Sequence, residues 1–350
     1  MKIHKHIYIV ILLLSVLMAM SGCEPGSDAE GSDEAVLVFQ KGGYPHAIKE
    51  GDTYYYTMPD SRQGYLSIYS ATSPDSLGQS SPVTVWETDD AGFQHIWSPE
   101  LHWIGGRWYM YFEADDGNTD NHHIYVLENE TESPLNRHWQ LHGPVVVNEE
   151  WNYGIHPSAF TVGDRLYMIW SGWEKRRTET ETQCIFIAEM ENPWTLKSER
   201  VLISRPEHEW ERQWINPDGS CSAYPIFVNE NPEAYISPDG RNVIINYSAS
   251  GIWTVFSTLG MLWAPTSADL LNPESWTKSP EPVFSVADDS QYGGVSNISL
   301  IPSADGQKTL MLYETKSFSG TINVNSSVLL KSIEWRDGLP EFGRYLVLSF

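Results

Sequence analysis

The chain has 350 residues, with 22 Lys and Arg against 46 Asp and Glu, so its formal net charge at pH 7 is −24. An acidic field of this size repels phosphate backbones and anionic lipid, which argues against a nucleic-acid-binding protein. A hydrophobic fraction of 41% is enough for a full core and excludes disorder for most of the chain, while 15 Trp and 18 Tyr suit either a packed β core or a surface that stacks on flat apolar faces.

The N-terminus has the pattern of a secretory signal. Lys2 and Lys5 precede a nearly all-aliphatic run at 7–17, and small residues follow as far as Cys23. This stretch resembles a bacterial lipoprotein signal, in which Cys23 becomes the lipidated first residue of the mature chain. An ordinary signal peptide and a single-span anchor are the alternatives, but the apolar run is shorter than the roughly 20 residues that a span needs. We therefore predict a lipoprotein signal peptide at 1–22.

An acidic tether is predicted at 23–35, because EPGSDAEGSDE at 24–34 has no large apolar residue. Removing 1–22 takes away two Lys, so the mature charge is 20 − 46 = −26. An acidic stretch directly after the lipidated Cys resembles the surface-export signal of Bacteroidetes-type lipoproteins. The expectation is a monomer attached by its lipid to the outer membrane, at the cell surface or facing the periplasm. An oxidising compartment permits Cys184 and Cys221 to pair, and the sequence leaves that pairing open.

Five segments repeat one pattern, in which a motif containing Pro or Ser leads into an apolar strand, a Gly turn and an aromatic-rich or aliphatic strand. In the first three, the Pro and the turn Gly are six residues apart. The segments are 44–56, 98–112, 156–170, 231–247 and 295–313, and their turn glycines are Gly51, Gly105, Gly163, Gly240 and Gly306.

Each segment is predicted to be a β-hairpin, because Gly-Asp, Gly-Gly and Asp-Gly turns accept positive φ at low cost. The turn glycines are 54, 58, 77 and 66 residues apart. A four-stranded propeller blade needs about 40 to 50 residues, and longer blades carry loops. The fold class is therefore predicted to be all-β, a single five-bladed β-propeller domain at 36–350. A β-sandwich, the alternative, would not repeat one motif at the start of every hairpin. The segment 346–350 could return to complete the first blade.

The first residues of the innermost strands are predicted to converge on one funnel. This places Tyr44, Glu100, His156, Glu233 and Asn297, with the adjacent Ser296, around a single site. Two carboxylates and a His in an aromatic-lined funnel suit glycoside hydrolysis, where one carboxylic acid protonates the leaving oxygen and another group activates water or attacks directly.

Two stretches carry a family resemblance. IWSPELH at 96–102, followed by WYMYF at 108–112, is similar to the second blade of glycoside hydrolase family 43, which includes arabinofuranosidases, arabinanases and β-xylosidases. NENPEA at 229–234, with YSAS at 247–250 and LGML at 259–262, resembles the fourth blade, whose Glu is the general acid. The resemblance implies a five-bladed propeller that hydrolyses glycosidic bonds with inversion and without a redox cofactor, and it assigns the acid to Glu233.

The sequence departs from the family pattern at three positions. Tyr44 stands where the family has the Asp that acts as general base, and His156 stands where an Asp usually tunes the pKa of the acid. Ser296 aligns with a family His that commonly lies near a central water or metal ion. No metal or other cofactor is predicted, although a structural calcium or other ion in the central channel is left open.

Three explanations for the missing base remain open. The base has moved to Glu100, Asp115 or Asp116, with His156 completing the proton balance. Alternatively, Tyr44 is a nucleophile assisted by a carboxylate, as in sialidases. In the third, hydrolysis is weak or lost and the funnel only binds sugar.

Three tryptophans, Trp97, Trp173 and Trp253, are candidates for stacking on sugar rings, although most Trp in a propeller fill the wedges between blades. The run DDGNTD at 115–120 has the oxygen density of a calcium loop but lacks the bidentate Glu downstream, so we expect a solvated turn. The sequence predicts an exo-acting glycosidase for plant-type oligosaccharides or polysaccharides. The alternative is a surface lipoprotein that binds glycans with little or no catalysis.

Overall fold

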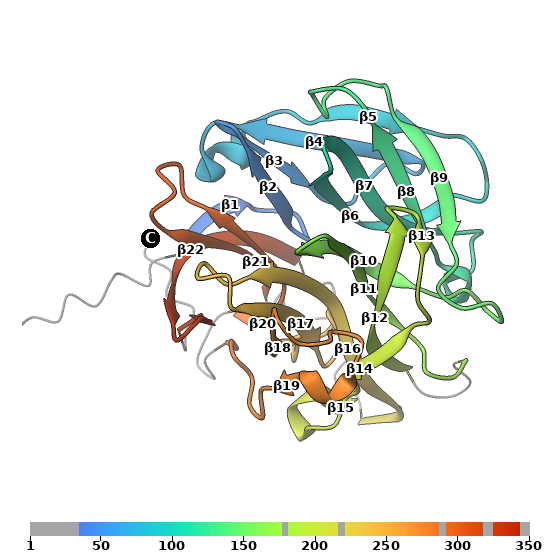
Figure 1. The fold of residues 1–350 in the computed structure, drawn as a ribbon, viewed down its shortest axis with the longest axis vertical. Helices are drawn as coiled ribbons and strands as arrows, with labels where there is room; N and C mark the ends of the chain where they lie inside the picture. The colour runs from blue at the N-terminus through green and yellow to red at the C-terminus, as the bar shows by residue number, and fades with distance from the viewer. Residues whose placement is uncertain (1–34, 177–180, 216–220, 287–291, 318–324, 344–350) are drawn as a thin grey trace, which may run out of the picture. The chain divides into compact units, whose positions relative to one another are not determined.

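The regular structure is almost entirely β-strand, arranged as blades that follow one another around a centre in chain order (Figure 1). The computed structural model describes residues 35–176, 181–215, 221–286, 292–317 and 325–343. The predicted signal peptide, Cys23 and all of the acidic tether except Ala35 lie outside these residues, as does 346–350. Among the described residues, no helix is long and apolar enough to cross a membrane.

The first two blades are antiparallel sheets of four strands each. The first contains β2 (His46–Glu50), β3 (Thr53–Thr57), β4 (Tyr65–Ala71) and β5 (Val83–Glu87). The second contains β6 (Gln94–Ile104), β7 (Arg107–Asp115), β8 (His123–Asn129) and β9 (Gln140–Val145). The short 3₁₀ helices η1 (Pro74–Gln79) and η2 (Thr119–Asn121) lie in the connections of these two blades.

The third and fourth blades are joined by a short parallel pairing between β12 and β16. The third contains β10 (Ile155–Val162), β11 (Arg165–Gly172) and β12 (Glu181–Asn192), with β13 (Thr195–Leu196) and β14 (Val201–Ser204) on the outer side of β12. The fourth contains β16 (Cys221–Ile236), β17 (Asn242–Ala249), β18 (Thr258–Pro265) and β19 (Thr277–Lys278), with β15 (Arg212–Ile215) paired to β16. The 3₁₀ helices η3 (Glu209–Glu211) and η4 (Pro273–Ser275) belong to this part of the chain.

The fifth blade is completed by a strand from the other end of the chain. It contains β20 (Tyr292–Pro302), β21 (Thr309–Ser317) and β22 (Asn325–Arg336), with β23 (Leu339–Glu341) paired to β22. The outermost strand is β1 (Val36–Phe39), which pairs antiparallel with β22. The first blade already has four strands of its own, so it does not depend on 346–350 for completion.

The five predicted turns are confirmed. Each of the five glycines has a positive φ, between 58° and 73°, and no heavy atom lies within 4 Å of the position a Cβ would take. The registers agree with hairpins, since Glu50 pairs with Thr53, Ile104 with Arg107 and Val162 with Arg165.

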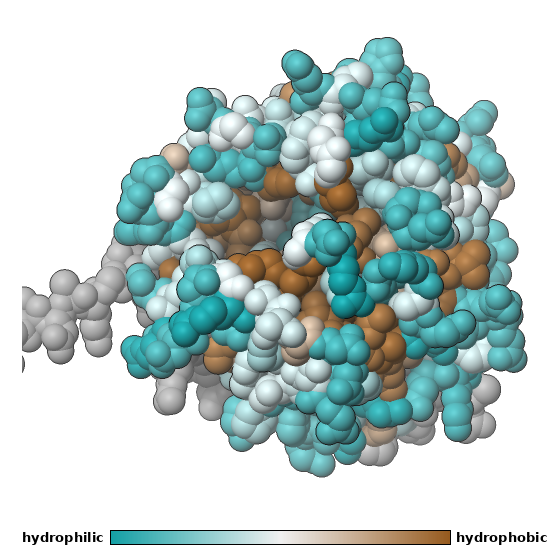
Figure 2. Space-filling model, viewed as in Figure 1, coloured by the Kyte–Doolittle hydropathy of each residue, from teal (hydrophilic) through white to brown (hydrophobic). Residues whose placement is uncertain are grey.

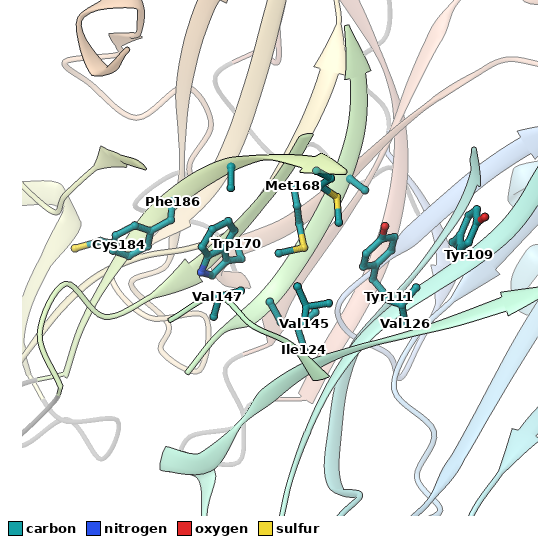
Figure 3. Packing of buried hydrophobic residues seen from close by; sticks show 13 residues of the cluster. Tyr109, Tyr111, Ile124, Val126, Val145, Val147, Met168, Trp170, Cys184 and Phe186 are labelled. Atoms are coloured by element: carbon teal, nitrogen blue, oxygen red, sulfur yellow. The ribbon is translucent and has the colours of Figure 1, made fainter. Parts of the chain in front are cut away.

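Five clusters of buried hydrophobic side chains fill the five wedges between neighbouring blades. The wedge between the second and third blades packs Tyr111 and Val126 against Met168, Trp170 and neighbouring side chains (Figure 3). Equivalent clusters lie between the first and second blades, the third and fourth, and the fourth and fifth. The remaining cluster joins the fifth blade and β1 to the first blade. Because every neighbouring pair shares a core, the blades close into a ring, and the five-bladed propeller is confirmed.

The face shown in Figure 2 has hydrophobic residues around a hollowed centre and hydrophilic residues along the rim. Cys184 is a buried free thiol within the wedge of Figure 3, and burial raises its pKa to about 12.

Candidate functional site

One residue on or just before each inner strand has a left-handed backbone. These residues occupy equivalent places in the five blades, and their φ values lie between 41° and 53°: Tyr44, Ser98, His156, Asn231 and Asn297. The first four directly precede a Pro. Positive φ is costly for residues other than Gly, so each position needs support from its surroundings.

That support comes from the preceding blade. In three of the five positions, the backbone N–H donates to a side chain on the second strand of the blade before it. Tyr44 N donates to Glu314 Oε2 (3.0 Å). Asn231 N donates to Ser171 Oγ (2.9 Å) and Asn297 N to Ser248 Oγ (2.9 Å). The upper ring, as we call these five residues, is therefore fixed by contacts between blades.

A cavity of about 300 Å³ opens beside the upper ring. Its walls combine aromatic and aliphatic side chains with polar and charged ones, a mixture that suits a site for a small polar molecule. The lining residues are Tyr44, Trp97, Thr119, Asp120, Tyr153, Ile155, His156, Gln183, Glu230, Ile252 and Trp253.

Glu230 is the carboxylate on the inner strands that reaches this cavity, and it was missed by sequence reasoning. It directly precedes Asn231 of the upper ring and is 1% exposed. Its Oε1 accepts a hydrogen bond from Ile252 N at 2.7 Å, which fixes the carboxylate between the fourth blade and the loop after β17. Aligning the repeats on the residue that precedes Pro matches Asn231, and not Glu233, with Tyr44 and His156. This alignment is the signal that could have drawn attention to Glu230.

Glu100 and Glu233 lie deeper in the channel than the cavity. Each follows its upper-ring residue by two positions, which moves it about 7 Å along the strand. The same step in all five blades gives a second set of inward side chains, the lower ring: His46, Glu100, Ser158, Glu233 and Ser299. All five are buried, and neither glutamate lines the cavity. Both carboxylates therefore lie two residues further along their strands than the positions equivalent to Tyr44 and His156. Their catalytic role stays a prediction, and their depth in the channel does not favour it.

Burial sets the protonation of the groups below the cavity. It lowers the pKa of His156 to about 3, so the imidazole is neutral at ordinary pH. Nδ1 of His156 accepts a hydrogen bond from Asn231 N (3.2 Å), so the proton of the neutral ring is on Nε2, 3.8 Å from Glu113 Oε1. Burial also raises the pKa of Glu113 to about 8, although the nearby His156 backbone N–H and Ser98 hydroxyl oppose that shift.

Tyr44 is held in its neutral form. Burial, and then the nearby carboxylates of Glu314, Glu230 and Glu113, raise the pKa of its hydroxyl well above the ordinary value. Its ring lies 5.5 Å from that of His156, measured between centroids. The two residues that occupy the places of the family's aspartates are therefore both neutral and adjacent.

The acidic run 115–120 shapes one wall of the cavity. Asp115 is buried and lies 3.0 Å from His95 Nδ1 and 3.3 Å from His122 Nδ1. Asp116 is exposed and accepts hydrogen bonds from Asn121 Nδ2. Neither lines the cavity, whereas Asp120, on η2, does. Asp115 and Asp116 thus hold the loop that carries Asp120.

The predicted sugar-binding residues divide into two groups. Trp97 and Trp253 line the cavity, and Trp97 stacks on His122 with 4.0 Å between centroids. Trp173 is buried behind the wall, where it stacks on Tyr153 at 3.7 Å. Asn297 is also buried, and its Nδ2 donates to Glu314 Oε2 at 2.6 Å. Trp173 and Asn297 therefore support cavity residues from behind, and their direct contact with substrate stays a prediction.

Comparison with known protein families decides the family. The model of glycosyl hydrolases family 43 matches residues 37–340. The chain belongs to this family. The match includes all five blades, so the family resemblance of the second and fourth blades extends over the whole propeller.

Several relatives are arabinofuranosidases. The chain is 31% identical over 318 residues to an extracellular exo-α-(1→5)-L-arabinofuranosidase of Streptomyces avermitilis, covering 87% of this chain and 62% of that protein. It is 30% identical over 347 residues to α-L-arabinofuranosidase 43 of Humicola insolens, covering 95% and 68%. The crystal structure of an α-L-arabinofuranosidase from Lactobacillus brevis is similar with a TM-score of 0.80 and 26% identity, covering 90% of this chain and 98% of the other. The chain thus spans less than two thirds of the length of its Streptomyces avermitilis relative.

Proposed function

We propose that this protein is a glycosidase that releases a terminal arabinofuranosyl-type sugar from plant oligosaccharides or polysaccharides. The observation that carries the proposal is Glu230, a buried carboxylate fixed by a backbone N–H at the wall of an aromatic cavity. A cavity of about 300 Å³ is at the small end of the range for ligand sites, which suits one sugar unit. The names of the arabinofuranosidase relatives support the choice of sugar.

Glu230 is proposed as the general acid that protonates the leaving oxygen. A group in this role must reach the bond that breaks, and Glu230 faces the cavity whereas Glu233 does not. The polar neighbours of the bound sugar are then the neutral His156 and the hydroxyl of Tyr44, which can position hydroxyl groups by hydrogen bonding.

Asp120 is proposed as the base that activates water. Among the described residues, Glu230 and Asp120 are the two carboxylates that line the cavity. They come from different blades, and an inverting enzyme needs its acid and base on opposite faces of the sugar ring. A Tyr44 nucleophile is disfavoured, because the raised pKa of its hydroxyl makes the reactive phenolate scarce. With a water-activating base the reaction inverts the anomeric centre, as the resemblance implies.

The rest of the substrate is proposed to lie in a neighbouring cavity of about 870 Å³ over the first blade. Tyr44 lines both cavities, so it stands at the junction between them. One small cavity beside one larger cavity suits exo action, with the terminal sugar in the first and the leaving chain in the second. The relatives named extracellular support a secreted or surface location, and lipid attachment at Cys23 belongs to the same proposal.

The test compares the wild type with Glu230→Gln and Asp120→Asn on arabinosyl, xylosyl and galactosyl oligosaccharides and on an aryl glycoside whose leaving group needs no proton. We expect arabinose release by the wild type and a loss of about 10²–10⁴-fold in both variants on oligosaccharides. On the aryl glycoside, Glu230→Gln should recover much of the rate and Asp120→Asn should not. If the wild type binds an oligosaccharide but releases nothing, the glycan-binding alternative replaces the glycosidase.

A further inference from the structure

The lower ring holds a group whose hydrogen bonding is incomplete. His46 is 6% exposed, and its Nε2 lies 2.9 Å from the carbonyl oxygen of Leu101. A carbonyl can only accept, so this nitrogen carries a proton and the neutral ring has a bare lone pair on Nδ1. Nδ1 has no hydrogen-bond partner among the described residues. A water, a proton or a cation satisfies an unpartnered buried nitrogen of this kind.

Carboxylates face that nitrogen. Nδ1 of His46 lies 3.3 Å from Glu233 Oε1 and 3.8 Å from Glu100 Oε2. Nε2 of His102 lies 3.1 Å from the same Glu100 oxygen. No ion pair among the described residues joins Glu100 or Glu233 to a lysine or arginine, so positive charge is missing where two buried carboxylates meet.

We propose that His46, Glu100 and His102 bind a divalent transition metal ion of the zinc type. One ligand atom from each of the three residues lies within 4.8 Å of the others. Zinc bonds to nitrogen or oxygen of about 2.0–2.1 Å in a tetrahedron separate neighbouring ligand atoms by about 3.4 Å. The separations of Glu100 Oε2 from His102 Nε2, 3.1 Å, and from His46 Nδ1, 3.8 Å, bracket that value.

The ligand types favour zinc over calcium. Two of the three ligands are imidazole nitrogens, whereas calcium takes six to eight oxygens at 2.3–2.6 Å. The Leu101 carbonyl orients His46 and fixes its tautomer, as the outer contacts of metal-binding histidines usually do. Ser158 donates a hydrogen bond to Glu100, and Glu233 Oε1 approaches the same Nδ1 of His46 and is the candidate for a fourth ligand.

The upper ring offers a cation a poorer place. Ser296, which aligns with the family histidine, lies 3.4 Å from the ammonium of Lys316, and that ammonium pairs with Glu314 at 2.6 Å. A positive charge is already present there, whereas the lower ring has none among its described contacts. The ion would therefore link the first and second blades about 7 Å below the sugar cavity, too deep to touch substrate.

The test measures metal content in tag-free protein that has been stripped with a chelator and then equilibrated with Zn²⁺ or Co²⁺. We expect one bound ion per chain, a tetrahedral visible spectrum with Co²⁺, and a rise in Tm on adding Zn²⁺. Glu100→Gln and His102→Gln should bind at least about tenfold more weakly. His142→Gln is the matched control, because His142 pairs with Glu128 on the outer strands of the second blade.

Absence of stoichiometric metal in the wild type would overturn the proposal. Equal metal content in all variants, or calcium that Zn²⁺ does not displace, would overturn it as well. Should a variant fail to fold, the stoichiometry and the Co²⁺ spectrum of the wild type still decide. Since every readout is metal content, spectrum or Tm, the result is independent of whether the protein is a glycosidase.

Discussion

At the scale of single residues, two neutral side chains, Tyr44 and His156, line the cavity beside the carboxylates of Glu230 and Asp120. The positions of the two aspartates expected from the family hold Tyr44 and His156, both neutral. Glu113 lies behind His156 with its pKa raised to about 8, so it is protonated over much of the ordinary pH range. This buried glutamate makes the stability of the fold depend on pH.

Glu113→Gln should become more stable than the wild type as the pH rises. The folded pKa of Glu113, about 8, is above the ordinary value of 4.5, so the folded state binds the extra proton between these values. Its contribution is therefore complete below about pH 4.5 and is lost as the pH rises through 8, whereas a glutamine does not titrate. We expect the difference in free energy of unfolding to grow by a few kcal/mol from pH 5 to pH 8.5.

His156 has the opposite sign and acts in a lower range. Its folded pKa of about 3 is below the ordinary 6.5, so its contribution is present above pH 6.5 and is lost as the pH falls towards 3. Because both proteins keep His156, the difference between their urea-unfolding curves isolates Glu113. A difference that stays constant from pH 5 to pH 8.5 would show that Glu113 is ionised in the folded state.

At the scale of the strand, the sequence predicted the hairpins better than it predicted which side chains of the inner strands face the cavity. Each hairpin turn is local, and a Gly with open space around its Cβ position defines it without help from the rest of the fold. The position of the left-handed residue in each inner strand decides which inward side chain faces the cavity. Residues two positions apart on a strand point to the same face. The alternation that predicts a strand therefore does not tell whether Asn231 or Glu233 lies nearer the cavity. The prolines after Tyr44, Ser98, His156 and Asn231 were the signal that could have done so.

Ser248→Ala should destabilise the fold because its hydroxyl accepts the N–H of Asn297 at 2.9 Å. Removing it leaves a buried N–H without an acceptor, at a cost of about 1–3 kcal/mol. The matched control is Ser332→Ala, at a half-buried position on β22 that caps no upper-ring residue. Urea-unfolding midpoints measure both, and equal midpoints for the two variants would mean that the cap does not stabilise the left-handed strand start.

At the scale of the whole molecule, closure of the ring depends on contacts between residues far apart in the sequence. The strand β1 pairs with β22, and Phe39 on β1 stacks on Tyr56 of the first blade at 4.6 Å between centroids. The repeat predicted five blades because each one has its own turn and strand pattern. It did not predict which end of the chain would complete the ring, because β1 is short and carries no copy of the motif.

Phe39→Ala should weaken the whole propeller by about 3–5 kcal/mol, since it empties a buried site between the fifth and first blades. Val36→Ala on the same strand is the control, because Val36 is 49% exposed and its truncation should cost about 0.5 kcal/mol or less. Thermal unfolding followed by both tryptophan fluorescence and far-UV circular dichroism measures the effect. Similar Tm values for the two variants would indicate that β1 does not hold the ring closed.

Glu230, and not Glu233, is proposed as the acid of the cavity. The most direct test is kcat/KM for arabinose release from an oligosaccharide by Glu230→Gln and Glu233→Gln, with folding of both verified by circular dichroism. We expect kcat/KM to fall by about 10²–10⁴-fold in Glu230→Gln and by far less in Glu233→Gln. Full activity in Glu230→Gln together with an inactive Glu233→Gln would contradict it and place the acid in the lower ring.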